Sequence, residues 1–469
     1  MRAVIYIGIV LGLLIPCLGT GQQDTTEVLT FEKFLEIVKE HHPMAKRADL
    51  QERLAESELL ISRGNFDPML FGQLNQKYFD ETQYYDLLDA GLKIPTWFGV
   101  ELYSGIEQTD GFYLNPENST PNTGLWYTGL SVPLGQNLFI DERRAMLKRA
   151  KIFVESSREQ RKLMYNDLLR NASFAYWDWF KQYNKVKVYE EAVEVAQERL
   201  DATLVDASIG ERPSIDTVEA DIQVQNRKIE LQQAQLDFKN ASALISFFIW
   251  AEGVIPLELE ANTVPPRMDE SLLRPVDPVY WSQLDTLQYF HPELQVYQYN
   301  IEQMKVQQQL KREMLKPRVN LKYNLLSEPI TGSPLNAFAI NNYRWGVDVA
   351  YPLFIRRERG ELRLTNLEIQ DLEYSMAGTV AELNYEIKAA INEWETTNDQ
   401  FKLFSRTVRD YETLLEGERE LFDVGESSLF LVNAREVGFI NAQVRLIDIL
   451  TKNRKAAINT AYTSGLLFD

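Results

Sequence analysis

The sequence is poor in the side chains that most enzymes use for catalysis. Its 469 residues include one cysteine and three histidines. It has no CxxC, HExxH, GxGxxG or P-loop motif. Without a nucleophile next to a base we predict no enzymatic activity, and we expect no cofactor and no metal site. The net charge of −19 also disfavours nucleic acid as a partner.

Long apolar runs are also missing. Residues 1–21 are typical of a secretory signal peptide, with Arg2 before an apolar stretch and small residues at 19–21. Cys17 lies inside this segment, and lipidation of Cys17 is an alternative that Pro16 disfavours. Beyond it no run of 18 apolar residues occurs, so we expect no transmembrane helix. An exported chain can still enter a membrane as a β-barrel.

Proline is absent from two long stretches, residues 139–210 and 354–425. A constant offset of 215 superimposes one stretch on the other and places Trp179 on Trp394. We therefore predict two long helices, 141–208 and 356–424, each about 100 Å long at ~1.5 Å per residue. Such lengths indicate a coiled coil or a helical repeat.

The repeat extends to both halves of the chain. His42-Pro43 precedes Pro68 by the same spacing with which His291-Pro292 precedes Pro317, and a structural role at a helix kink is the expected role of both histidines. We predict two structural repeats, 22–250 and 279–469, joined by a Pro-rich connector at 251–278. Each repeat has a first helix, β segments (68–135 and 317–353), a long helix and a return helix (213–250 and 428–464).

The β segments are two-faced. Apolar and polar residues alternate strictly over 318–325 and 343–351, and more loosely over 69–78 and 126–132. The stretch 91–106 is also typical of a strand and has no counterpart in the second half. A soluble sandwich would bury the apolar side chains, whereas a membrane barrel would turn them to lipid. The lipid-facing candidates are Trp126, Leu130, Val132, Val319, Leu321, Tyr323, Trp345, Val347 and Val349.

Two similar turns follow the long helices. They share Gly-Glu, then Ser, an aliphatic residue, Val and Ala, with one residue deleted in the second turn. Four strands are too few to close a barrel, so several chains would have to share one. With these duplicated turns, the chain resembles the TolC-like outer-membrane efflux family over nearly its whole length.

The resemblance implies a mainly helical trimer in which each chain gives four strands to a shared twelve-stranded outer-membrane β-barrel. Long coiled-coil helices would continue the barrel into the periplasm. It also implies an exit duct of a tripartite efflux or type I secretion system in a Gram-negative outer membrane. The partners would be lipid, a periplasmic adaptor and an inner-membrane pump of the RND or ABC type. The alternative is a secreted or periplasmic coiled-coil protein with a structural or adhesive role.

The family places both turns at the inner, closing end of the duct. Phe422 stands where some members carry a latching Tyr, and Ser427 where those members carry an Arg. Asp216 and Glu219 share a helix face and would form an acidic ring in a trimer, or simply complement the helix dipole. The constriction candidates are Gly210, Glu211, Asp216, Glu219, Gly425, Glu426, Phe430 and Asn433.

Overall fold

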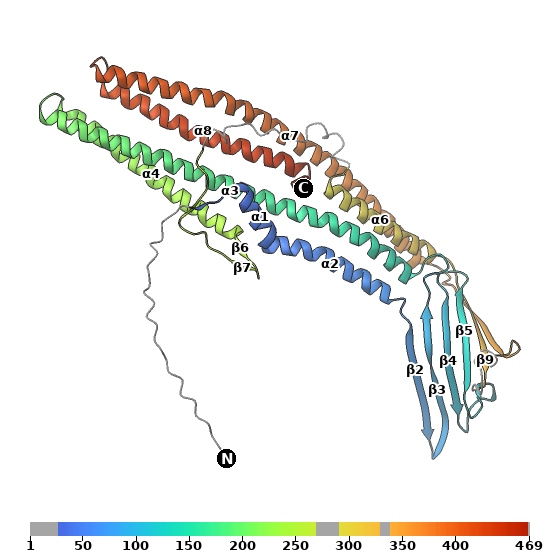
Figure 1. Cartoon of the computed structure of the whole chain (residues 1–469). Helices are drawn as coiled ribbons and strands as arrows, with labels where there is room; N and C mark the ends of the chain where they lie inside the picture. The colour runs from blue at the N-terminus through green and yellow to red at the C-terminus, as the bar shows by residue number, and fades with distance from the viewer. Residues whose placement is uncertain (1–26, 269–289, 329–337, 468–469) are drawn as a thin grey trace, which may run out of the picture.

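The computed structural model describes residues 27–268, 290–328 and 338–467. The expected signal peptide with Cys17, the end of the connector and the start of the second repeat therefore lie outside the described residues. Within these ranges the fold class is confirmed: the chain is mainly helical, with one larger antiparallel sheet at one end (Figure 1).

Two long helices run along the whole helical part of the molecule. They are α3 (Glu142–Ser208) and α7 (Arg356–Asp423), and each turns back into a helix of half its length, α4 (Ser214–Phe248) and α8 (Leu429–Thr463). The absence of proline leaves every backbone N–H of the long helices free to bond. Two ion pairs join α3 to α8: Lys455 of α8 pairs with Asp178 of α3 at 2.6 Å, and Lys185 of α3 pairs with Asp448 of α8 at 2.7 Å.

Shorter helices flank the long ones on the side of the sheet. They are α1 (Phe31–His41), α2 (Pro43–Gly64) and α6 (Pro292–Glu313). His42 and His291 cap α2 and α6, and each Nδ1 accepts a backbone N–H two residues ahead, at 3.1 and 3.2 Å. Proline follows as the first helical residue in both cases, where its missing N–H costs nothing. The predicted structural role of the two histidines is confirmed.

The main core lies at mid-height, where α1 packs against α3. Trp179, Tyr176, Phe34 and Phe180 are fully buried there. Tyr176 donates its hydroxyl hydrogen to the carbonyl of Leu29 at 2.9 Å. Two short, two-stranded sheets lie beside this core. In one, β1 (Glu27–Val28) pairs with β8 (Thr263–Val264), and in the other, β6 (Trp250–Ala251) pairs with β7 (Ile255–Pro256). The described part of the connector is thus anchored beside the long helix.

The larger sheet has six strands, in the order β10-β9-β5-β4-β3-β2. The first half supplies β2 (Met69–Phe79), β3 (Thr82–Pro95), β4 (Glu101–Asp110) and β5 (Leu125–Pro133), and the second half β9 (Arg318–Ser327) and β10 (Tyr343–Ala350). A short 3-10 helix, η1 (Pro116–Asn118), lies in the loop after β4. The expectation of four strands per chain is therefore wrong.

Turn chemistry explains the missed strands. The stretch 91–106 is two strands joined by a tight turn, in which Gly99 has φ +96° and its N–H bonds to Thr96 at 3.2 Å. The turn between β2 and β3 uses Asp80 and Glu81 at φ +51° and +54°, positions where glycine or asparagine is the usual signal. Without that signal, the sequence does not mark where β2 ends and β3 begins.

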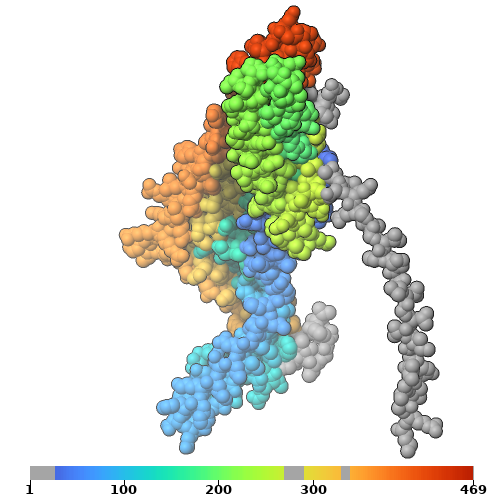
Figure 2. Space-filling model, turned by 90° about the vertical axis from the view of Figure 1, so that its left-hand side faces the viewer, coloured from blue at the N-terminus to red at the C-terminus, as the bar shows by residue number. Residues whose placement is uncertain are grey.

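The two ends of the molecule differ in kind. Figure 2 shows the turns of both helical hairpins, green and red, at the end opposite the blue strands. Four helices reach the sheet: α2 leads into β2, α6 into β9, and α3 and α7 follow β5 and β10. Candidate functional residues thus lie at two separate ends, the turns and the sheet.

Candidate functional site

The two turns that end the long helices are built alike. Gly210 and Gly425 have φ values of +82° and +79°, and an added Cβ would meet no atom within 4 Å at either position. Conformation, and not space, therefore requires glycine here. The next residues close both turns, with the N–H of Glu211 on the Asp206 carbonyl at 2.9 Å and that of Glu426 on the Leu421 carbonyl at 2.8 Å.

The remaining constriction candidates fall into two groups. Phe430 is 66% exposed in the single chain, and Asp216 is half-buried. Asn433 is buried, and its amide donates to the Glu219 carboxylate at 3.2 Å. The structure therefore brings Glu219 and Asn433 together between the two hairpins, whereas Phe430 points to solvent at the same level.

Two residues that the sequence analysis did not select complete this contact. Arg199 of α3 donates to the side-chain amide oxygen Oδ1 of Asn433 at 2.8 Å and forms an ion pair with Glu436, which is 5% exposed. Arg419 of α7 lies 3.9 Å from the same Glu436 carboxylate. Arg199 stands 11 residues before Gly210 and Glu436 stands 11 residues after Gly425. Equal distance from two matched turns was the signal that could have predicted this pair.

A further contact lies nearer the turns. The Arg212 guanidinium lies 4.6 Å from the ring centre of Phe422 and donates to Asp206 at 2.9 Å. Ser427, at the position discussed for an Arg, donates instead to Glu418. The two hairpins of one chain are therefore joined by a charged group on an aromatic ring.

At the other end, the strand register settles which side chains share a face. Leu130 and Trp345 both lie opposite Tyr323, and Val132 and Val347 both lie opposite Leu321. Directly opposite residues of antiparallel strands lie on the same face. All nine lipid-facing candidates therefore fall on one face of β5, β9 and β10, here called the apolar face.

The opposite face, here called the polar face, carries paired charges. Arg344 of β10 donates to both carboxylate oxygens of Glu107 of β4, at 2.9 and 3.1 Å, across the two intervening strands β9 and β5. Lys322 and Asp348 pair at 3.2 Å, and the Tyr127 hydroxyl donates to Asp89 at 2.8 Å. The charged and polar side chains of this face therefore pair with side chains on other strands and remain accessible to water.

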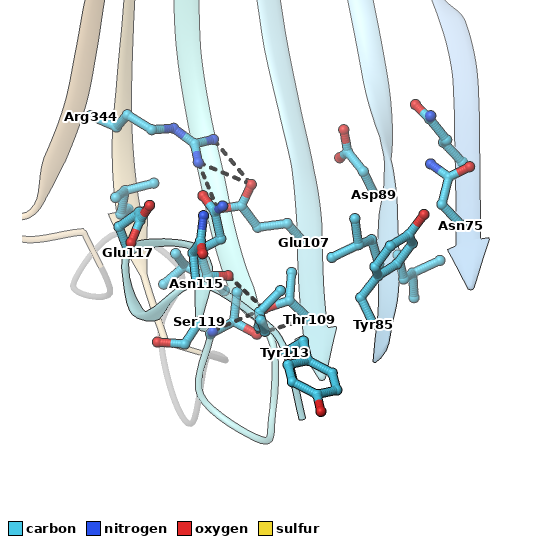
Figure 3. Close-up of a pocket in the computed structure, with 18 residues that line it drawn as sticks. Asn75, Tyr85, Asp89, Glu107, Thr109, Tyr113, Asn115, Glu117, Ser119 and Arg344 are labelled. Atoms are coloured by element: carbon cyan, nitrogen blue, oxygen red, sulfur yellow. Dashed lines mark hydrogen bonds and ion pairs between the residues drawn. The ribbon is translucent and has the colours of Figure 1, made fainter. Parts of the chain in front are cut away.

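The loop between β4 and β5 folds over this polar face at the outer end of the sheet. Thr109 of β4 holds it with two bonds, its N–H to the Thr120 hydroxyl at 2.9 Å and its own hydroxyl to the Asn118 carbonyl at 2.7 Å. Figure 3 shows Arg344, Glu107 and this loop around an open hollow. The loop between β4 and β5 therefore covers part of the polar face at this end of the sheet.

The described residues hold no group of three His, Cys, Asp or Glu side chains that could bind a metal ion. The same part of the chain has no helix that is both long enough and apolar enough to cross a membrane.

The geometry gives the described chain two distinct ends. Two long helical hairpins with matched turns lie at one end, and a two-faced antiparallel sheet lies at the other.

Comparison with known proteins gives the family. The sequence profile of the outer membrane efflux protein family matches residues 285–460, which lie in the second half of the chain. No curated protein sequence matches the chain. The resemblance inferred from the duplicated Gly-Glu turns is confirmed.

Solved structures agree over nearly the whole chain. The CmeC outer membrane channel of Campylobacter jejuni is 14% identical with a TM-score of 0.62, over 93% of this chain and 86% of that one. The outer membrane protein VceC of Vibrio cholerae is 13% identical with a TM-score of 0.64, over 93% and 96%. The open MtrE outer membrane channel of Neisseria gonorrhoeae is 13% identical with a TM-score of 0.63, over 93% and 89%. At this identity the likeness establishes the fold.

Proposed function

We propose that this chain is the subunit of an exit duct, through which solutes pass from the periplasm across the outer membrane. The observation that carries the proposal is the six-stranded sheet with one apolar and one polar face, at the end of helices about 100 Å long. A sheet of that kind needs lipid on one side and water on the other. The helices then have the length to reach far into the periplasm.

A trimer is the assembly that we propose for the duct. A membrane sheet cannot leave its edge strands unpaired, because an unpaired backbone group in lipid costs several kcal/mol. One chain leaves both β2 and β10 unpaired within the described sheet. Further copies must therefore complete the wall, and the fold of the related channels favours three.

The turns at the other end are the proposed docking surface for a periplasmic adaptor and, through it, an inner-membrane pump. Large apolar side chains are exposed all around both turns, a pattern typical of a protein interaction site. They are Val205, Ile209, Ile215, Val218, Val424 and Phe430, each more than half exposed in the single chain. We propose that the constriction lies here, with Asp216 as its acidic member.

Fractionation and conductance together test the duct. We expect the protein in the outer-membrane fraction, and we expect the purified trimer to give stepwise conductance in a planar bilayer. Recovery in the soluble periplasmic fraction, with no conductance, would favour the coiled-coil structural protein instead. The apolar face of the sheet argues against that alternative, because a periplasmic rod has no use for it.

A further inference from the structure

The first half of the chain carries an extra hairpin in its sheet. The offset between the halves falls from 249 residues at His42 and His291 to 215 at Phe139 and Phe354. The first half therefore contains 34 more residues between its short and long helices. The hairpin of β3 and β4, from Thr82 to Asp110, takes up most of them. It lies between β2 and β5, so it sits inside the sheet and not at its margin.

The hairpin continues both faces of the sheet. Leu102 lies opposite Leu130 of β5 and opposite Ile94 of β3, so the apolar face passes through both added strands. Leu92 and Leu88 continue it to Leu70 and Leu74 of β2. On the polar face, Asp89 lies opposite Glu107 and Lys93 opposite Tyr103. An excursion into solvent would not keep this alternation in register over six strands.

Side chains of the polar face tie the hairpin into the wall. Tyr127 lies opposite Gly105, and its ring crosses β4 so that the hydroxyl reaches Asp89 on β3 at 2.8 Å. A Cβ at Gly105 would stand 2.7 Å from that hydroxyl oxygen. Gly91, on the next strand, faces the ring of Phe71 in the same way, at 3.1 Å. Glycines under aromatic rings permit the close approach that a curved sheet needs.

The two edges of the sheet are complementary in direction. β2 leaves the helices and β10 returns to them, since the six strands of the described sheet alternate in direction. Every residue of β10 is exposed, as are all but one of β2. Two copies standing side by side would therefore present antiparallel edges to each other. An odd number of strands would have presented parallel ones.

We propose that β10 of one copy pairs with β2 of the next, so that three copies close a barrel of eighteen strands. This proposal rests on the trimeric duct proposed above. Each copy contributes all six strands of its sheet, including the β3–β4 hairpin. The partner is therefore a second copy of this chain, presenting the opposite edge.

The stagger of the sheet predicts the register of that contact. A line drawn perpendicular to the strands joins Met69, Lys93, Tyr103, Gly129, Asn324 and Arg344. Arg344 lies six residues from Ala350, the end of β10 next to the helices, whereas Met69 is the first residue of β2. If Met69 of the next copy pairs with Ala350, the strands tilt by about 35°, which is the tilt of closed barrels.

The same register matches the two faces. It places Gln73 opposite Gly346 on the polar face, and Leu74 opposite Trp345 on the apolar face. The perimeter of such a barrel also matches the perimeter of the ring of helices below it. Eighteen strands tilted by about 35–40° have a perimeter of roughly 110 Å. Four helices per copy, twelve in the trimer, have about the same perimeter at ~9 Å spacing. An eighteen-stranded wall leaves an aqueous lumen, which the loop between β4 and β5 narrows.

Cysteine cross-linking tests the contact. In the described chain there is no native cysteine, so introduced pairs report without interference. We expect oxidised Gln73→Cys/Gly346→Cys protein to run as a covalent trimer on a denaturing gel. Gly346 has open space around its Cα and accepts the change. The matched control, Gln73→Cys/Val347→Cys, places its thiols on opposite faces and should remain monomeric.

Two further outcomes make the test decisive. A link from Gln73→Cys to position 344 or 348 would support the barrel with a register shifted by two residues. A conducting trimer without any link from position 73 to 344, 346 or 348 would overturn the eighteen-stranded barrel and leave the proposed duct intact. Absence of both trimer and conductance would instead overturn the duct. Electron microscopy of the particle in detergent counts the strands directly, and twelve would refute the proposal.

Discussion

Arg212 lies over the ring of Phe422, with 4.6 Å between the guanidinium carbon and the ring centre. Arg212 follows the first turn of the chain, and Phe422 precedes the second by three residues. The contact therefore joins the two hairpins where both reverse direction. A cation over an aromatic ring contributes about 0.5–1 kcal/mol at an exposed site.

The first prediction concerns this contact. Arg212→Gln removes the cation and its bond to Asp206, so the two hairpins lose a link at the proposed constriction. We expect the open fraction of single channels to rise about two- to fivefold, the ratio that 0.5–1 kcal/mol gives. Single-channel recording measures it. Arg212→Lys keeps the charge and should stay close to native. Equal open fractions in all three proteins would show that the contact does not hold the turns.

The second prediction concerns the buried pair of Arg199 and Glu436. Arg199→Ala leaves a carboxylate that is 5% exposed with Arg419 at 3.9 Å as its remaining cation. Breaking a buried pair costs about 3–5 kcal/mol. We therefore expect a much larger open fraction than for Arg212→Gln, and a lower melting temperature. Arg357→Ala removes an exposed Arg–Glu pair at the other end of α7 and serves as the control. An Arg199→Ala protein with native open fraction and native melting temperature would contradict the role of this contact.

The third prediction tests the orientation of the sheet. Val347 lies on the apolar face and Gly346 on the polar face of the same strand, where an added Cβ has open space. A lysine at the bilayer midplane costs about 2–4 kcal/mol. We expect Val347→Lys to lower the yield of membrane-inserted trimer and Gly346→Lys to leave it unchanged. The reverse result would mean that the polar face meets the lipid.

The sequence was sufficient for the parts of the fold that depend on local rules. The long helices follow from the absence of proline, and β9 and β10 from strict alternation. The β3–β4 hairpin was missed because Leu87-Leu88 and Ala90-Gly91 break the alternation, and because Asp80-Glu81 turns without glycine. The pair of Arg199 and Glu436 depends on how the two hairpins pack, so its only signal in the sequence is the equal spacing of 11 residues from Gly210 and Gly425.

The fourth prediction is a pH dependence that comes from His291. Burial lowers the pKa of His291 to about 4, because an environment with little water disfavours the charged imidazolium. A lowered folded-state pKa gives stability that is present above pH ~6.5 and is lost as the pH falls towards 4. The full difference is on the order of 3 kcal/mol.

His291→Asn keeps a helix cap and removes the titration. We expect its melting temperature to fall less than that of the native protein between pH 7 and pH 4. Subtracting the two curves isolates His291 from the carboxylates around it. His41→Asn, at a half-buried neighbouring position of the first half, is the control and should follow the native curve. Parallel curves for native and His291→Asn would refute the assignment.

The last prediction concerns the acidic residues of the constriction. Asp216 starts the return helix α4 and is half-buried, whereas Glu219 accepts from Asn433 within its own chain. In a trimer, three copies of Asp216 would face one axis. Three carboxylates that lie close together attract a divalent cation more strongly than one carboxylate does. We expect Asp216→Ala with Glu219→Ala to raise the concentration of divalent cation for half block roughly tenfold. Because Glu219 already accepts a hydrogen bond from Asn433, Asp216→Ala alone should account for most of the change.

Glu56→Ala with Glu58→Ala removes the same charge from exposed positions on α2 and should leave the block by divalent cations unchanged. Unchanged block in the Asp216 variants would place the constriction elsewhere in the duct.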